Sequence, residues 1–191
     1  MAKSKKSSGA LPLALELLEA DHRKVEMLFK QYEEEKDADE DTKRPIAEQI
    51  CGELTVHAQV EEEIFYPWLR ENLSEEDMEL LEEAYVEHST AKDLIAQLEG
   101  GDAIDETYDA KVKVLSEYIK HHVKEEEDEI FKKLGDKKEE LDELGQQMAS
   151  RKAELAEELG LTPDDEEGSM ESVARKRGDK GSSRGAQRGA R

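Results

Sequence analysis

HAQVEEEIFYPWL, residues 57–69, and its partial repeat HVKEEEDEIFKKL, residues 122–134, lie 65 positions apart and decide the fold. Each begins with a histidine and places a glutamate four positions later, His57 with Glu61 and His122 with Glu126. Residues four apart lie on the same face of an α-helix, and at about 100° per residue both pairs fall within the apolar face. Buried polar groups cost free energy unless something compensates them. The two stretches therefore predict helices with a polar site on their inner faces.

Two further helices each carry one histidine in an apolar stripe. His22 lies between Leu18 and Val25, and His88 follows Leu81 on its own stripe. The chain thus reads as a helix with one histidine, then a helix with His-x-x-x-Glu, and then the same pair again. A single inward histidine is more often a hydrogen-bonded core residue than a ligand. Four of them on four helices, with two glutamates on the same faces, indicate one shared site.

The neighbouring acidic and histidine residues are predicted to lie outside this site. His121 points about 140° away from the inner face, so His121/Glu125 is expected to be an exposed pair. Glu62 and Glu63 are likewise predicted to be solvated.

Helical periodicity extends along the chain from about residue 11, and no run with the period of a strand is persuasive. Helices are expected over residues 12–36, 45–73, 74–100, 105–134 and 137–159. Pro45 suits a first helical turn, Ser74 with Asp77 resembles a capping box, and Gly160 with Pro163 closes the last helix. We predict an all-α protein, an up-down-up-down four-helix bundle over residues 11–135 with an additional helix at 136–160. The basic residues 1–10 and the Gly/Arg-rich tail 161–191 are predicted to be disordered.

The composition limits the partners. The 191 residues carry a formal net charge of −22, and 41% of them are charged. Such an acidic body repels nucleic acid and anionic membranes, so neither is expected as a partner, except for weak nucleic-acid contact through the tail RKRGDKGSSRGAQRGAR at residues 175–191.

Cys51 is the single cysteine, which favours a reducing compartment, and its thiol is expected to be buried and inert. Glu16 interrupts the one signal-like apolar run, and no stretch is long enough to span a bilayer, so we expect a cytoplasmic protein.

Imidazole and carboxylate groups without thiolates suit iron, manganese or zinc. A single tetrahedral zinc would leave at least two of the six inward groups without a partner. Six ligands in two repeated halves instead indicate two metals. The ferritin-like pattern needs two Glu-x-x-His pairs, and only Glu19/His22 has that spacing, so that class is set aside.

These segments resemble the hemerythrins, and more closely the hemerythrin-like HHE cation-binding domains. The resemblance lies in EADHRKV, HAQVEEEIFYP, EHSTAKDLI and HHVKEEEDEIF, and it covers about residues 11–134. It implies two non-haem iron ions in a four-helix bundle, oxo- or hydroxo-bridged, with oxygen, peroxide or nitric oxide as the small ligand. Carried over by residue, the implied metal ligands are His22 and His57 for one iron, His88 and His122 for the other, and Glu61 and Glu126 as bridges.

The sequence departs from the family at two places. Oxygen-carrying hemerythrins have a second histidine one turn from His88, where this chain has Ala84 and Lys92. Lys132 replaces a frequent proline, which should affect only how that helix ends. Without the extra histidine both irons would keep an open position, which favours reaction with peroxide or a response to iron or redox state over simple oxygen transport.

Three functions stay open on the sequence alone. The first is a di-iron protein that binds or turns over oxygen, peroxide or nitric oxide. The second is an iron-, oxygen- or redox-responsive sensor or interaction module without turnover, in which the fifth helix or the tail reports metal occupancy to a protein partner. The third is a metal-free acidic helical interaction protein. Tyr85 and Tyr118 are expected near the level of the ligands, more often as packing residues than as hydrogen-bond donors.

Overall fold

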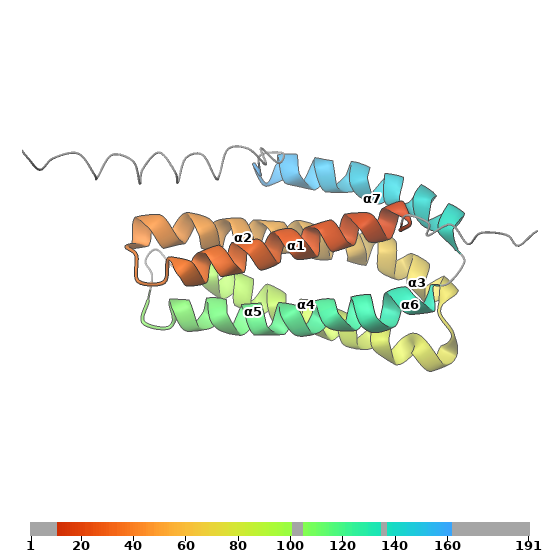
Figure 1. Cartoon of the computed structure of the whole chain (residues 1–191), viewed down its shortest axis with the longest axis horizontal. Helices are drawn as coiled ribbons and strands as arrows, with labels where there is room; N and C mark the ends of the chain where they lie inside the picture. The colour runs from red at the N-terminus through yellow and green to blue at the C-terminus, as the bar shows by residue number, and fades with distance from the viewer. Residues whose placement is uncertain (1–10, 101–104, 135–136, 162–191) are drawn as a thin grey trace, which may run out of the picture. The chain divides into compact units, whose positions relative to one another are not determined.

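The computed structural model describes residues 11–100, 105–134 and 137–161, and all the regular structure within these ranges is helical (Figure 1). Four long helical segments form the predicted bundle, and a fifth helix lies beside it. In chain order the elements are α1 (Leu13–Glu34), α2 (Glu40–Val60), η1 (Glu61–Phe65), α3 (Tyr66–Asn72), η2 (Glu75–Asp77), α4 (Met78–Glu99), α5 (Tyr108–Glu125), η3 (Glu126–Ile130), α6 (Phe131–Lys133) and α7 (Lys138–Glu158). The all-α, hemerythrin-like bundle with an additional C-terminal helix is confirmed. Of the segments predicted to be disordered, only Leu161 lies within the described ranges, and it is ordered, because its side chain packs against the core and its N–H donates to the Ala156 carbonyl (2.8 Å). The other residues of these segments lie outside the described ranges.

Two predicted helix starts differ from the structure. The second helix begins at Glu40, five residues before Pro45, because the Asp39 side chain caps it by accepting a hydrogen bond from the Thr42 N–H (3.1 Å). Pro45 therefore lies inside the helix, in its second turn, where it cannot donate a backbone hydrogen bond to the Asp41 carbonyl. Ser74 does not cap the next helix through a backbone N–H. Its hydroxyl donates to the Asp77 carboxylate instead (2.6 Å).

Each repeat of the opening sequence contains a π-helical turn that begins at its inward glutamate. The Tyr66 N–H bonds back to the Glu61 carbonyl, and the Phe131 N–H bonds back to the Glu126 carbonyl. A π turn takes in one extra residue, which changes the direction of every later side chain on the helix. On a regular helix Tyr66 would point about 140° away from Glu61, whereas one extra residue reduces this to about 40°. The π turn therefore brings Tyr66 onto the inner face.

The core consists of two apolar clusters with a polar layer between them. We call them the Leu18 cluster and the Ile50 cluster. The Leu18 cluster includes Leu15, Leu18, Val60, Phe65, Leu69, Leu81, Ile130 and Met148. The Ile50 cluster includes Val25, Phe29, Ile50, Leu54, Ile95, Val112, Leu115 and Ile119. At about 25 cal/mol per Å² of buried apolar surface, these clusters supply the main driving force for folding. Cys51 is buried in the Ile50 cluster, and burial raises its pKa to about 12, so the thiol is inert as expected.

Helix α7 packs along α1 and α2 (Figure 1). Gly145 permits this close approach, because a Cβ at this position would lie 2.5 Å from the Ala14 backbone nitrogen. The Asp142 carboxylate accepts a hydrogen bond from the Leu13 N–H (2.8 Å), which satisfies one of the free donors at the start of α1. The predicted end of this helix is confirmed by Gly160, which follows it at φ +67°. None of the helices in the described ranges is long and apolar enough to cross a membrane.

Candidate metal centre

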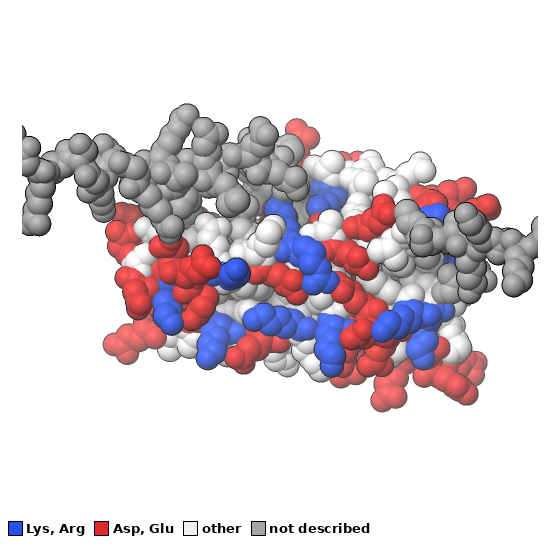
Figure 2. Space-filling view, viewed as in Figure 1, with Lys and Arg blue, Asp and Glu red and all other residues white. Residues whose placement is uncertain are grey.

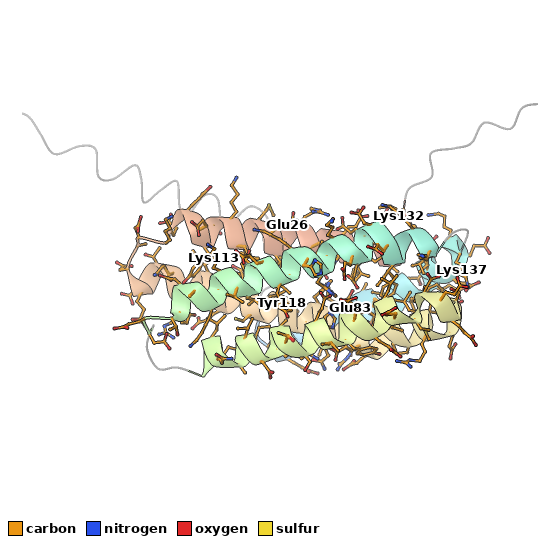
Figure 3. The ribbon with its side chains drawn as sticks, turned by 90° about the horizontal axis from the view of Figure 1, so that it is seen from below. Glu26, Glu83, Lys113, Tyr118, Lys132 and Lys137 are labelled. Carbon is orange, nitrogen blue, oxygen red and sulfur yellow. The ribbon has the colours of Figure 1, made fainter. Side chains whose placement is uncertain are left out.

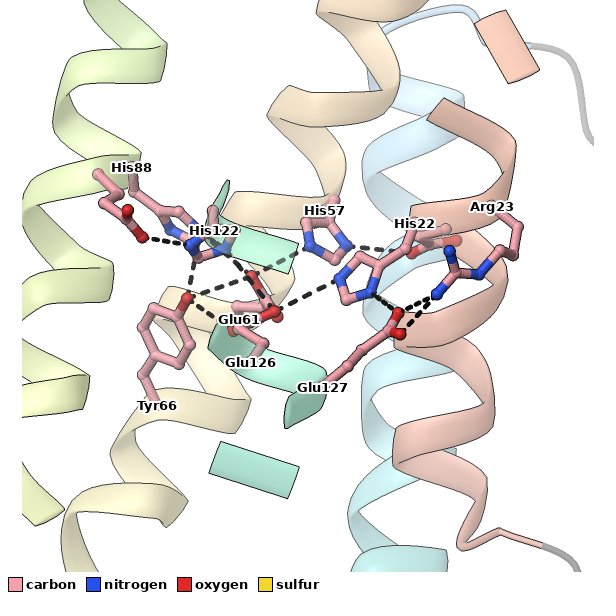
Figure 4. Close-up of polar contacts among 11 residues, drawn as sticks. His22, Arg23, His57, Glu61, Tyr66, His88, His122, Glu126 and Glu127 are labelled. Carbon is pink, nitrogen blue, oxygen red and sulfur yellow. Dashed lines mark hydrogen bonds and ion pairs between the residues drawn. The ribbon is translucent and has the colours of Figure 1, made fainter. Parts of the chain in front are cut away.

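Six side chains predicted to point inward meet in the polar layer between the two apolar clusters (Figure 4). The four histidines come from four different helices, and the two glutamates are the first residues of the π turns η1 and η3. The fractional exposure of each is between 0% and 6%. The set consists of His22, His57, Glu61, His88, His122 and Glu126. As predicted, His121 lies outside it and is 60% exposed.

The Nε2 atoms of all four histidines point towards the two glutamates. Glu61 Oε2 lies 3.2 Å from Nε2 of both His57 and His88. Glu126 Oε2 lies 3.3 Å from Nε2 of His22 and 3.7 Å from that of His122. Each carboxylate therefore lies between two imidazoles from different helices. This is the arrangement that a pair of bridging carboxylates requires.

The Nδ1 atoms of the same histidines each face another carboxylate. Nδ1 of His22 donates to Glu127 (2.9 Å), that of His88 to Glu62 (3.1 Å) and that of His122 to Glu87 (2.8 Å). Nδ1 of His57 lies 3.5 Å from Asp21 Oδ2. A carboxylate on one ring nitrogen fixes the tautomer and leaves the lone pair of the other nitrogen free for a metal.

These four outer acids were missed by the sequence analysis, and Glu62 was wrongly expected to be solvated. The helical wheel places them beside the inner face, but their side chains reach across to a neighbouring helix. The internal repeat did carry a signal. Asp21 and Glu87 each precede an inward histidine, and Glu62 and Glu127 each follow an inward glutamate. Glu63 does lie on the outside, where its carboxylate pairs with the Arg151 guanidinium of α7 (2.7 Å).

Three of the outer acids also contact a cationic side chain. Glu62 accepts from Lys92 (2.6 Å), Glu127 from Arg23, and Asp21 from Lys152 of α7. The fourth, Glu87, lies 3.8 Å from His121 Nε2. A buried carboxylate with a cationic partner stays ionised and oriented. In agreement, the hydrogen bond from His88 and the contact with Lys92 lower the pKa of Glu62 to about 2.

The hydroxyl of Tyr66 lies among the inward residues of the site. Its hydroxyl donates to Glu126 Oε1 (3.1 Å) and lies 3.4 Å from Glu61 Oε2 and 3.1 Å from His88 Nε2. Burial, together with the charges of both glutamates, raises its pKa well above the usual value, so it keeps its proton. Tyr85 packs edge-on against the Tyr66 ring, with 5.0 Å between ring centroids. Tyr118 is exposed on α5, which rules out the role considered for it beside the ligands (Figure 3).

Burial and charge contacts shift the pKa values of the inward residues in opposite directions. Burial by itself lowers the pKa of His22 and His88, but contact with the inward glutamates outweighs this effect and raises both values to about 9. Burial raises the pKa of Glu126, but the charges of His122 and His22 and the contact with His22 outweigh that and lower it. Without a metal, the imidazoles of His22 and His88 therefore hold protons near the ionised carboxylate of Glu126. A metal cation that binds must displace those protons.

The polar atoms of the site fit a metal. Five buried side-chain nitrogen and oxygen atoms in the described ranges lack a hydrogen-bond partner, and all five belong to the six inward residues. They are Nε2 of His22, both ring nitrogens of His57, Oε1 of Glu61 and Oε2 of Glu126. Lone pairs on imidazole and carboxylate are what a borderline metal cation such as iron accepts.

A small cavity adjoins the histidines on the side of the Ile50 cluster. Its volume is about 20 Å³, enough for one water-sized molecule. Besides the four histidines, the cavity is lined by Asp21, Lys92 and a larger number of apolar side chains, among them Val25, Leu54, Ile95, Ile119 and Val123. Tyr66, by contrast, belongs to the Leu18 cluster.

Comparison with known proteins gives two matches. The model of a family described as "Hemerythrin HHE cation binding domain" matches residues 13–134, which include all six inward residues and end before α7. A curated protein of Nostoc sp. (strain PCC 7120 / SAG 25.82 / UTEX 2576), named "DNA nickase", is 31% identical over 119 residues. The alignment covers 61% of this chain and 32% of that protein, so the chain spans about a third of the relative's length. No solved structure matches.

Proposed function

This chain belongs to the family of hemerythrin HHE cation-binding domains, and from that premise we propose that its buried site binds two non-haem iron ions. Through them the protein binds or reacts with oxygen, peroxide or nitric oxide. The observation that carries the proposal is the common orientation of the four histidines, with every Nδ1 facing a carboxylate and every Nε2 facing Glu61 or Glu126. A core that used these histidines only for packing would have no need to orient all four alike.

We assign His22 and His57 to one iron and His88 and His122 to the other, with the two glutamates as bridges. Two groups of potential ligand atoms support this division, each with its atoms within 4.8 Å of one another. One group is His22, His57, Glu61 and Glu126, and the other is Glu61, His88 and His122. Bound iron would supply a redox-active pair of Lewis acids between these residues.

The residues around the site favour a small, uncharged ligand and an open metal position. Ala84 has no ligand atom, and the Lys92 ammonium is held by Glu62, so neither replaces the additional histidine of the oxygen carriers. The volume of the cavity, about 20 Å³, suits a diatomic or water-sized molecule. We therefore infer a protein that reacts with its ligand rather than a simple oxygen carrier.

The name of the Nostoc relative suggests DNA cleavage for that protein, but the properties of this chain do not favour carrying it over. The candidate ligands are at most 6% exposed, and a phosphodiester cannot reach them in this arrangement. Lysine and arginine side chains alternate with acidic ones on the face shown in Figure 2. With a net charge of −22 the chain repels DNA. The likeness to about a third of that protein therefore does not carry DNA cleavage over to this chain.

The first test is metal analysis of the purified protein, followed by optical spectra on exposure to oxygen, peroxide and nitric oxide. We expect about two irons per chain and spectral changes with at least one of the three ligands. A protein that contains no transition metal and takes up none when ferrous iron is added anaerobically would refute the proposal. Reversible oxygen binding through repeated cycles without oxidation would instead identify a carrier.

Replacing Tyr66 with phenylalanine tests whether the buried hydroxyl positions the two inward glutamates. We expect the variant to bind iron about tenfold more weakly, because its hydroxyl contacts both proposed bridging carboxylates, and partners that orient metal ligands contribute about 10–100-fold to metal affinity. The measurement is an anaerobic titration with ferrous iron in competition with a chromogenic chelator. Tyr85→Phe is the matched control, since Tyr85 packs against the Tyr66 ring and its loss of a hydroxyl should leave the affinity unchanged. An unchanged affinity in Tyr66→Phe would make Tyr66 a packing residue.

A sensor without turnover is the second candidate, favoured by the contact between α7 and the outer acid Asp21. It predicts iron-dependent stability or partner binding without catalytic consumption of oxygen or peroxide. We place either form of the protein in the cytoplasm, where a single buried cysteine needs no oxidising environment.

A further inference from the structure

Helix α7 lies outside the residues that match the family model, yet one of its side chains reaches the histidine layer. Lys152 Nζ contacts Asp21 Oδ1, while the other oxygen, Oδ2, faces Nδ1 of His57 at 3.5 Å. Nε2 of the same imidazole lies 3.2 Å from Glu61. Contacts from Lys152 through Asp21 and His57 to Glu61 therefore connect α7 to one of the proposed bridging carboxylates, and the contact of 3.5 Å between Asp21 and His57 is the longest of them.

Asp21 differs from the other outer acids in the origin of its cation. Glu127 and Glu62 take theirs from α1 and α4, through Arg23 and Lys92, both within the matched domain. Asp21, whose side chain is 8% exposed, takes its cation from α7. A carboxylate this deeply buried needs a cationic partner, because breaking such a pair leaves an uncompensated charge. The orientation of Asp21 thus depends on whether α7 is docked.

We propose that α7 completes the metal centre, with Lys152 as a positioning residue that acts through Asp21 on His57. The proposal rests on the iron site proposed above. Lys152 holds one oxygen of Asp21, which keeps the other oxygen directed at Nδ1 and leaves Nε2 of His57 directed at the metal position. Because coupling between two sites is reciprocal, a metal held by His57 stabilises the docked position of α7 by the same factor. The docking of α7 against the bundle therefore depends on whether the site holds a metal.

The other contacts of α7 show how this coupling can be isolated. Arg151, the residue next to Lys152, pairs with Glu63, which faces away from the histidines (2.7 Å). Both residues are cations on the same turn of α7, and both bind a carboxylate of the bundle. Only the contact of Lys152 continues to a proposed ligand. Arg151→Met is therefore the matched control for Lys152→Met.

The test is an anaerobic titration of the full-length protein with ferrous iron in competition with a chromogenic chelator. We expect Lys152→Met to bind one of its two irons about tenfold more weakly, the lower end of the 10–100-fold effects known for partners of metal-bound histidines. Lys152→Arg should restore the affinity to within about threefold, and Arg151→Met should match the wild type. If Lys152→Met binds both irons as tightly as the wild type, the inference is wrong. If the wild type itself binds no iron, the proposed function is wrong, and the inference that rests on it is wrong as well.

Hydrogen exchange of residues 138–158 separates positioning from a merely structural role. In the wild type, iron should slow exchange in α7 by about the factor by which Lys152 strengthens iron binding, roughly tenfold. In Lys152→Met that additional protection should disappear, while Arg151→Met should lower protection equally with and without iron. Iron-dependent protection that survives in Lys152→Met would overturn the role assigned to Lys152.

Discussion

Glu61→Gln is expected to reduce the iron content from about two per chain to one or fewer. Glu61 is completely buried, and its Oε2 atom lies 3.2 Å from an imidazole of each proposed iron site. Glutamine keeps the shape but removes the negative charge and replaces one acceptor oxygen by an amide donor, which cannot bind a metal. Replacing a residue that both iron sites share should therefore remove more iron than replacing a residue that serves one site. Metal analysis of protein purified and reloaded in parallel with the wild type is the measurement.

Glu63→Gln and Glu62→Gln are the graded controls for this result. Glu63 faces α7 and should be replaceable without loss of iron. Glu62 holds Nδ1 of His88, so its replacement should weaken iron binding by about 10–100-fold without abolishing it. A Glu61→Gln protein with the full iron content would exclude Glu61 as a bridge. Equal losses in all three variants would indicate a general effect of acidic charge rather than ligation.

Removing iron is expected to lower the melting temperature of the bundle by about 10 °C. A metal present at about a thousand times its dissociation constant stabilises the folded state by about 4 kcal/mol, and 1 kcal/mol corresponds to about 2–4 °C for a chain of this length. The physical reason is the set of five buried polar atoms without hydrogen-bond partners, which metal-free protein must leave unsatisfied or pair with protons. Thermal unfolding followed by circular dichroism, before and after chelation, is the measurement.

Readdition of ferrous iron under anaerobic conditions should restore the melting temperature, whereas magnesium, which prefers oxygen ligands, should not. A melting temperature that is the same with and without chelator, in wild type and in His57→Ala alike, would support the metal-free interaction protein considered from the sequence. His121→Ala is the control for a histidine outside the site, since His121 is 60% exposed. It should behave like the wild type in both conditions.

The two halves of the site are equivalent in their inner residues and differ in their outer ones. Both outer acids that precede an inward histidine contact the next histidine along the bundle, Asp21 with His57 and Glu87 with His122. Beyond them the symmetry ends, because Asp21 is held by Lys152 of α7 whereas Glu87 faces the exposed His121. We therefore expect the two irons to differ in affinity, and α7 to act mainly on the iron that His57 holds.

Most of the fold and the inner residues of the site could be predicted because both depend on periodicity. An apolar stripe with a period near 3.6 determines which face of a helix is buried, and the repeat at 65 positions put two His-x-x-x-Glu pairs on such faces. The same method failed for Tyr66, because it assumes a regular helix. The π turn that begins at Glu61 moves Tyr66 by about 100° towards the site, and nothing in the helical pattern indicates the turn.

The sequence by itself determined four amphipathic helices, their order, and six polar side chains directed into one core. The tertiary structure alone decided which outer acid holds which histidine, as for Glu127 and His22, which are 105 positions apart, and that Lys152 of α7 contacts Asp21. Periodicity fixes the buried face of each helix, but not the rotation and axial shift of one helix against another. Contacts between long side chains on different helices depend on that rotation and shift, and these are set by the packing of the whole core.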